Sequence, residues 1–183
     1  MRRCFPVVMV CLASYITVAG QVKDKFETFQ VQNKDIVWQM NFRCTGGYDS
    51  VRAVVVQMLK SKFFTFNVIR NEAGYNGEIK HYRIDCKSYG RTYFNTPRMF
   101  WDGEWTGKFV VEVFDGLYTV KVYALYYESA TIADNYYKSE KTVKGRLFDA
   151  VIKKDGVTFK KLQLVNLTLL SQSLRDSFTL LAQ

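Results

Sequence analysis

The side chains best suited to ligand chemistry lie together in Trp-Asp-Gly-Glu-Trp, residues 101–105. Indole rings can stack on a sugar ring, and nearby carboxylates can accept hydrogen bonds from its hydroxyl groups. Two carboxylates could also hydrolyse a glycosidic bond, but neighbours on one turn rarely approach the same bond from opposite sides. We therefore predict ligand binding rather than catalysis, with core packing of the tryptophans as the alternative. The predicted ligand-binding residues are Trp101, Asp102, Glu104 and Trp105.

Tyr123 and Tyr127 extend this candidate site. Both are expected on the outward face of a hairpin, where a strand that meets only water would favour Thr or Lys. Tyrosine is enriched at protein interfaces. We therefore predict that this face is covered by a C-terminal helix, by a loop over residues 128–142 or by a partner, and we add both tyrosines to the ligand-binding set.

The single histidine, His81, is not predicted to be catalytic. A catalytic triad needs a nucleophile and an orienting carboxylate around its base, and the sequence near His81 indicates neither. A structural zinc site normally takes four ligands, and the cysteines that could join His81 are expected to be oxidised. We predict a protein with no enzymatic activity, no metal and no cofactor.

Basic side chains outnumber acidic ones, which gives the sequence a formal net charge of +9 at pH 7. They gather loosely in residues 80–91, 138–146 and 153–161. A cationic surface suits an anionic glycan, a lipid headgroup or an acidic protein. No nucleic-acid recognition motif accompanies it. The predicted partner is an extracellular protein or an anionic glycan, not a nucleic acid.

The third basic span is less concentrated than its sequence implies. If Asp155-Gly156 forms a hairpin turn, Lys153 lies opposite Thr158 and Lys160 lies opposite Val151. The lysines of this span then share no single side of the hairpin. Tight binding to a sulfated glycan is therefore not expected here.

The first 20 residues have the pattern of a secretory signal. Arg2 and Arg3 precede an apolar run over residues 4–19, and small residues stand before Gln21. The run is shorter than the roughly 20 residues that a membrane-spanning helix needs. We predict a secreted protein that begins near Gln21 and does not stay inserted in a membrane after cleavage.

Signal removal leaves Cys44 and Cys86, and two cysteines in an exported chain indicate a disulfide. Both are expected at inward-facing positions of strands, so we predict a bridge between them. Asn166-Leu167-Thr168 is a glycosylation sequon. Glycosylation of Asn166 is predicted on condition that the chain is exported.

The element that must position these residues is a hairpin over residues 107–127. Asp115-Gly116 is expected to form a type I′ turn, which pairs Phe114 with Leu117 and Val111 with Val120. On the opposite face, Glu112 lies diagonal to Lys121 and can pair with it. The inward face is predicted to carry Phe109, Val111, Val113, Tyr118, Val120 and Val122.

The rest of the chain is predicted to be mostly strands. These are expected over residues 36–44, 51–59, 63–70, 79–87, 143–154 and 157–164, with loops at 71–77 and 128–140. Residues 91–101 look extended, but Pro97 restricts them to an edge or bulged strand. Leu170, Leu174, Phe178 and Leu181 follow helical spacing, so a short amphipathic helix is expected from residue 167.

About eight or nine short strands with regular turns indicate an all-β fold, here a single domain after residue 20. We predict an antiparallel β-sandwich, immunoglobulin-like or jelly-roll-like, with a short C-terminal helix. An eight-stranded lipocalin-like barrel is the alternative. The matching functions are a secreted, non-enzymatic protein that binds through its sandwich surface, or a lipocalin-like carrier of a small apolar ligand.

Overall fold

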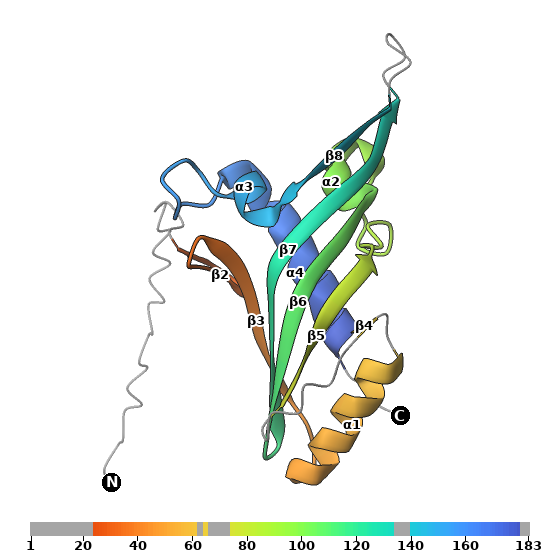
Figure 1. Ribbon diagram of the computed structural model, residues 1–183, viewed down its shortest axis with the longest axis vertical. Coiled ribbons are helices and arrows are strands. Elements are labelled where there is room, and N and C mark those ends of the chain that lie inside the picture. The colour runs from red at the N-terminus through yellow and green to blue at the C-terminus, as the bar shows by residue number, and fades with distance from the viewer. Residues whose placement is uncertain (1–23, 62–63, 66–73, 134–139, 180–183) are drawn as a thin grey trace, which may run out of the picture.

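The hairpin predicted at the centre of the sequence is also the centre of the sheet (Figure 1). The structure is a computed structural model that describes residues 24–61, 64–65, 74–133 and 140–179 of the 183-residue chain. Its strands form one antiparallel sheet in the order β1-β2-β3-β7-β6-β5-β4, and β8 also pairs with β7. The strands are β1 (Lys25–Phe26), β2 (Phe29–Gln32), β3 (Asp35–Arg43), β4 (Phe64–Thr65), β5 (Gly74–Tyr82), β6 (Gly103–Phe114), β7 (Leu117–Ala133) and β8 (Glu140–Arg146).

Helices lie between and after these strands. The α-helices are α1 (Tyr48–Ser61), α2 (Arg98–Trp101), α3 (Leu147–Val151) and α4 (Leu164–Phe178), and short 3₁₀ turns cover Tyr93–Asn95 and Lys161–Gln163. Figure 1 shows α4 crossing behind β7, β6 and β5, with α1 at the lower end of the sheet. The sheet therefore has helices where a sandwich would have a second sheet.

The predicted register of the β6–β7 hairpin is confirmed, because Phe114 pairs with Leu117 and Val111 pairs with Val120. The six predicted inward side chains are all buried. Lys121 Nζ lies 3.0 Å from Glu112 Oε1 on the opposite face, as expected. Of the two turn residues only Gly116 has a positive φ, 70°, so the predicted type I′ turn is wrong.

The predicted C-terminal helix is confirmed and supplies the second layer of the core. Leu170, Leu174 and Phe178 are fully buried, as their spacing along one helical face requires. The Phe178 ring lies 6.1 Å from Trp38 on β3 and 5.8 Å from Phe109 on β6. The helix therefore covers the inward face of the hairpin, and it leaves the outward face of Tyr123 uncovered.

The prediction of a mostly antiparallel β protein with a C-terminal helix is confirmed. The finer choice between sandwich and barrel is not confirmed. The described strands belong to one sheet, and its two end strands, β1 and β4, are not paired with each other.

The predicted strand at residues 51–59 is wrong, because this segment lies within α1. Val51, Val55 and Leu59 are fully buried at helical spacing, whereas Val54 is 37% exposed. A valine-rich run is typical of strands, but burial against the sheet overrides that preference. Arg52 Nε donates to the Tyr75 hydroxyl at 3.0 Å, which ties α1 to β5.

Other predicted boundaries also change. The edge strand at 91–101 is wrong, because α2 begins directly after Pro97, whose missing N–H costs nothing there. The predicted loops at 71–77 and 128–140 are partly strand, since β5 begins at Gly74 and β7 continues to Ala133. The strands predicted at 143–154 and 157–164 reduce to the end of β8 and one bridge between Ile152 and Phe159. Most of the strand predicted at 63–70 lies outside the described residues, as does the predicted signal.

The predicted Cys44–Cys86 disulfide is wrong, and both thiols are free. The Cys44 N–H donates to Gly116 O at the β6–β7 turn, whereas Cys86 Sγ donates to Phe100 O beside α2. Most of the length of β5 separates these places, and nine residues of strand span about 30 Å. A disulfide needs Cα atoms within about 7 Å. Cys44 follows β3 and Cys86 follows β5, and these two strands end at opposite ends of the sheet.

Free thiols give a direct prediction for a chain that begins at Gln21. We expect reductant to leave the thermal midpoint unchanged, and iodoacetamide to modify the half-buried Cys44 faster than the buried Cys86. Burial raises the pKa of both thiols, which slows both reactions. Mass spectrometry of the native and unfolded protein measures the modification. A midpoint that falls on reduction would contradict the structure.

The predicted register around Asp155-Gly156 is confirmed. The Lys153 N–H donates to Thr158 O at 2.8 Å, and the Lys160 N–H donates to Val151 O at 2.8 Å. The Asp155 carboxylate accepts from the N–H of Val157 and of Thr158. Hydrogen bonds from Thr158 and Val157 lower the pKa of Asp155 from its ordinary 3.8 to about 2.

A lowered pKa in the folded state gives a stability that depends on pH. The charged form of Asp155 is favoured by folding, so its contribution is complete above pH 4 and disappears as the pH falls towards 2. We expect the difference in unfolding free energy between the wild type and Asp155→Asn to shrink over that interval. Urea denaturation between pH 2 and pH 5 measures it. A difference that stays constant with pH would mean that the carboxylate is not held by these bonds.

Candidate functional site

The structure does not gather the Trp-Asp-Gly-Glu-Trp side chains on one surface. Trp105 is fully buried, with ring centres 5.4 Å from Phe100 and 5.5 Å from Tyr127. Trp101 is half-buried at the end of α2, and Asp102 caps that helix. Glu104 points the other way from Trp105 because neighbours on a strand alternate. A ligand-binding role for these residues stays a prediction.

Glu104 is held by the side chains of His81 and Arg83 on the outward surface of β6. His81 Nδ1 lies 2.9 Å from Glu104 Oε2, and the Arg83 guanidinium donates to Oε1. These hydrogen bonds, from His81 first and Arg83 second, lower the pKa of Glu104. A carboxylate kept ionised in this way is unsuited to act as a general acid. His81 itself is 82% exposed, whereas the neighbouring Tyr82 is buried.

Tyr123 and Tyr127 lie on opposite faces of the sheet, so the prediction that both face outward is wrong for Tyr127. The pairing of β6 with β7 shifts by one residue between Thr106 and Lys108, and Ala124 has a φ of 52° there. This bulge reverses the alternation. Tyr123 pairs with Lys108 on the outward face, while Tyr127 packs on Trp105 in the core.

The remaining predicted surface residues are less available than expected. Asn166 is only 5% exposed, and its Nδ2 donates to Gln163 Oε1 at 3.1 Å, so glycosylation is not supported. Lys160 Nζ donates to the carbonyls of Asp149 and Ala150 at the end of α3. Lys160 therefore does not join Lys153 in a common cationic patch.

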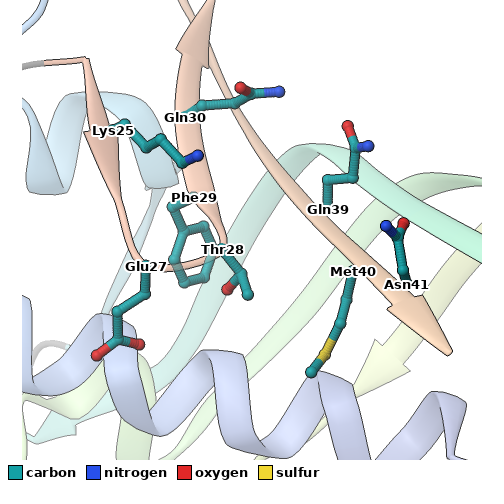
Figure 2. A pocket seen from close by; sticks show the side chains of 8 residues that line it. All are labelled: Lys25, Glu27, Thr28, Phe29, Gln30, Gln39, Met40 and Asn41. Atoms are coloured by element: carbon teal, nitrogen blue, oxygen red, sulfur yellow. The ribbon is translucent and has the colours of Figure 1, made fainter.

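A different site lies at the edge of the sheet, where β2 ends and β3 continues. Phe29 pairs with Trp38, and the Gln39 N–H donates to Thr28 O at 2.9 Å. Beyond Gln39, β3 is paired only with β7. A depression of about 230 Å³, which we call the notch, lies between β3 and the β1–β2 turn (Figure 2). It is lined by Lys25, Glu27, Thr28, Phe29, Gln30, Gln39, Met40 and Asn41.

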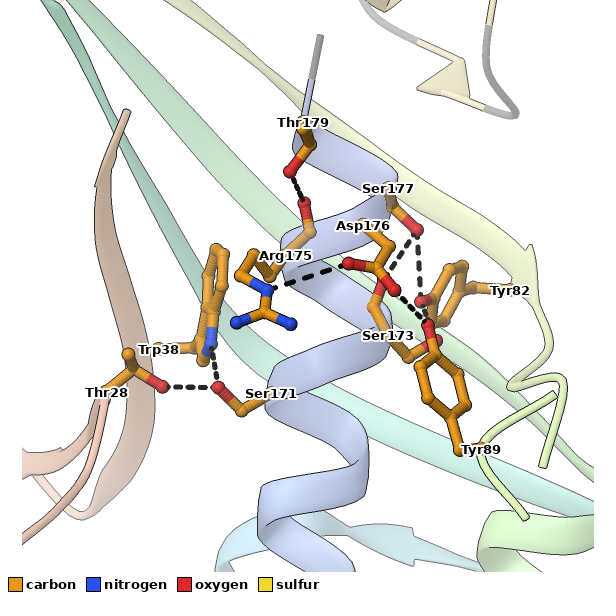
Figure 3. A network of polar contacts seen from close by, with 10 residues as sticks. All are labelled: Thr28, Trp38, Tyr82, Tyr89, Ser171, Ser173, Arg175, Asp176, Ser177 and Thr179. Carbon is orange, nitrogen blue, oxygen red and sulfur yellow. Dashed lines mark hydrogen bonds and ion pairs between the residues drawn. The ribbon is translucent and has the colours of Figure 1, made fainter. Parts of the chain in front are cut away.

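Helix α4 holds the turn that forms one wall of the notch. Thr28 Oγ1 lies 2.7 Å from Ser171 Oγ, which also accepts from Trp38 Nε1 at 3.1 Å (Figure 3). Thr168 Oγ1 donates to Glu27 Oε1 at 2.9 Å. Glu27 has a positive φ of 50°, an uncommon conformation that these contacts maintain. The notch is therefore formed before any ligand arrives.

The same helix is also fixed to β5 and to the segment that follows it by a second set of polar contacts (Figure 3). The buried Tyr82 hydroxyl lies 2.5 Å from Ser173 Oγ and 3.1 Å from Ser177 Oγ. Tyr89 donates to Asp176 Oδ2 at 2.6 Å. Burial raises the pKa of Tyr82, and burial and the Asp176 carboxylate raise that of Tyr89, so both hydroxyls keep their protons. The contacts with Thr28 and Trp38 and those with Tyr82 and Tyr89 together set the position of α4 against the sheet.

The backbone of β3 beside the notch lacks hydrogen-bond partners. Alternate residues of a strand point their N–H and C=O groups to opposite sides. The Cys44 N–H points to Gly116 at the β6–β7 turn, on the β7 side of β3, whereas the Gln39 N–H points to Thr28, away from β7. Asn41 and Arg43 therefore direct their backbone groups to the open edge, and in the described part of the chain those groups make no hydrogen bond. We call the notch together with Asn41–Arg43 the edge site.

The charges at the edge site are mainly positive. Lys25 and Arg43 are exposed near its two ends, and within the described ranges neither forms an ion pair. The acid of the notch, Glu27, accepts a hydrogen bond from Thr168. The amide side chains of Gln30 and Gln39 add donors.

Sequence reasoning missed this site because residues 21–34 look like a polar lead-in. The signal that could have found it is the alternation of Phe29 and Val31 with glutamines, followed by Asn33-Lys34. Both turn residues have positive φ, 49° and 58°, as a tight hairpin turn requires. That pattern predicts the β2–β3 hairpin, although not the point at which β2 ends.

Comparison with known proteins adds little to this geometry. No protein-family model matches the sequence, and no curated protein does. A crystal structure of a TBP-like protein from Parabacteroides distasonis is similar at 13% sequence identity and a TM-score of 0.43, over 83% of this chain and 88% of that chain. A similarity this distant indicates nothing about ligand or partner.

None of the described helices is long and apolar enough to cross a membrane. No group of three His, Cys, Asp or Glu side chains within the described ranges is placed to hold a metal ion.

Proposed function

We propose that this protein is a non-enzymatic binding module of the extracellular space that recognises a protein partner through the edge site. The observation that carries the proposal is the preformed notch beside the unpaired backbone of Asn41 and Arg43. Backbone N–H and C=O groups are strong hydrogen-bonding groups, and an open strand edge is a template for another chain.

A protein partner fits this site better than a small apolar ligand. Pockets for small molecules usually enclose about 300–1,000 Å³, and the notch measures about 230 Å³. The inward face of the sheet, where a carrier would hold its ligand, is filled by Leu170, Leu174 and Phe178. An anionic glycan is also less favoured, because Lys153 and Lys160 do not form one patch. Recognition at an edge needs only one open sheet, so the proposal does not depend on a β-sandwich.

The extracellular location rests on the first 20 residues, whose charged, apolar and small-residue regions have the pattern of a secretory signal. Expression of the full sequence with a C-terminal tag tests this part. We expect tagged protein in the secreted fraction with an N-terminus near Gln21. Retention of the intact N-terminus in the cell would contradict it.

The binding role is tested by selecting random displayed peptides on the immobilised protein. We expect selected peptides to compete with one another and to lose affinity by about tenfold or more when Gln30→Trp fills the notch. Thr106→Trp is the control, because Thr106 is exposed on β6, away from the notch. Failure to select any peptide, or peptides unaffected by Gln30→Trp, would contradict the proposal. Saturable binding of a fluorescent fatty acid would favour the carrier instead.

A further inference from the structure

We infer that the partner is an acidic, extended peptide segment that adds a strand to β3 at Asn41–Arg43. This inference rests on the proposed function and names the chemistry of its partner. Asn41 and Arg43 each present an N–H and a C=O to the open edge, at the spacing of alternate strand residues. An extended peptide offers the complementary groups at the same spacing, which is the basis of recognition by strand addition.

The notch determines how far and in which direction the peptide runs. Every pairing of this sheet is antiparallel among the described strands, and antiparallel pairing is slightly more stable per residue. An antiparallel peptide passes Arg43 first and Asn41 next, and then reaches Gln39, whose N–H is already bound to Thr28. Pairing therefore stops there, and the C-terminal end of the bound segment enters the notch.

The charges favour acidic side chains at both ends of this segment. An acidic residue opposite Arg43 would form a cross-strand pair of opposite charge on the outward face. At the other end, Lys25 and the amides of Gln30 and Gln39 line the notch and can donate to a carboxylate. Loss of Arg2 and Arg3 with the signal lowers the net charge of the sequence from +9 to +7, which still adds a general attraction for acidic chains.

A second copy of this protein fits the edge less well. Symmetric pairing centred on Phe42 would place the two Arg43 side chains on diagonal positions about 7–8 Å apart, with no acid between them. Symmetric pairing centred on Asn41 would require the Gln39 N–H, which Thr28 already accepts. The short edge and its cations therefore oppose self-association.

The test uses a synthetic seven-residue peptide that alternates valine with glutamate, and a version with lysine in place of glutamate. Binding to the exported protein is measured by calorimetry. We expect the acidic peptide to bind about tenfold or more tightly than the lysine version. Arg43→Glu should remove that preference, whereas Lys108→Glu, an exposed cation on β6, should leave it.

Backbone methylation separates strand addition from simple charge attraction. Only alternate peptide residues direct their N–H groups to β3. N-methylation of one alternate set should weaken binding by about tenfold, and methylation of the other set should change it by less than about threefold. Amide exchange of Asn41 and Arg43, measured by NMR, should slow when the peptide binds.

The outcomes distinguish this inference from the proposed function. Equal effects of the two methylated sets would overturn strand addition. Selected library peptides that compete at the notch while the acidic peptide does not bind would overturn the inference and leave the binding role intact. A dimer in sedimentation that Arg43→Glu alters would show a second copy as the occupant. No peptide binding of any kind would reject both proposals.

Discussion

Replacing Phe178 with alanine is expected to lower the free energy of unfolding by about 3–5 kcal/mol. The ring is fully buried and lies between Trp38 on β3 and Phe109 on β6. Its removal leaves a cavity at the place where α4 joins β3 and β6. Urea denaturation followed by circular dichroism measures the loss, provided that the transition is two-state.

Val165→Ala is the matched control on the same helix. Val165 is 58% exposed, so its truncation is expected to change the free energy of unfolding by less than about 0.5 kcal/mol. Comparable losses for the two variants would mean that α4 does not pack on the sheet through the Phe178 face.

Replacing Gly103 with alanine is expected to cost about 3 kcal/mol, the upper end for steric overpacking. A Cβ at this position would lie 2.0 Å from the Met99 carbonyl oxygen. That atom is backbone, so α2 and the start of β6 would have to move apart. The contact between Phe100 and Trp105 would be disturbed as a result. The same denaturation experiment measures the effect, and near-uv circular dichroism reports the tryptophan environment.

Gly47→Ala serves as the control for Gly103→Ala. A Cβ on Gly47 would meet only the Asp115 carboxylate at 3.4 Å, which is ordinary contact with a side chain that can rotate. We expect a change of less than about 0.5 kcal/mol. A Gly103→Ala variant as stable as Gly47→Ala would contradict the close approach of α2 to β6.

The sequence predicted best those elements whose pattern depends on local spacing. The β6–β7 hairpin has alternating apolar residues and a short turn, and these fix its register without help from the rest of the chain. Helix α4 was predicted from Leu170, Leu174 and Phe178, which form one apolar face. In both cases the periodicity also identifies which face is buried.

Prediction failed where a segment fits both periodicities. Residues 51–59 carry apolar side chains at nearly every position, so the choice between strand and helix depends on what the segment packs against. Single-residue bulges caused the second kind of error. The bulge at Ala124 turns Tyr127 inward, and its one sign in the sequence is Gly107 on the paired strand, where the register shifts.

The sequence did not predict the edge site, for a third reason. Its main feature is the difference in length between β2 and β3, together with backbone groups that every residue possesses. Residue types indicate chemistry only when side chains perform it. Of the candidate residues chosen for their types, Trp105 lies in the core and Glu104 lies in a surface ion pair.

The position of α4 at the end of the described chain has a consequence for the order of folding. The contact of Thr28 with Ser171 joins residues 143 positions apart. Phe178 of the same helix contacts Trp38 on β3, Phe109 on β6 and Tyr118 on β7. A nascent chain that has reached only β8 exposes the part of the inward face that α4 covers. Folding dominated by such distant contacts is slow. We therefore expect the packing of β3, β6 and β7 on their inward face to be completed only after α4 has been synthesised.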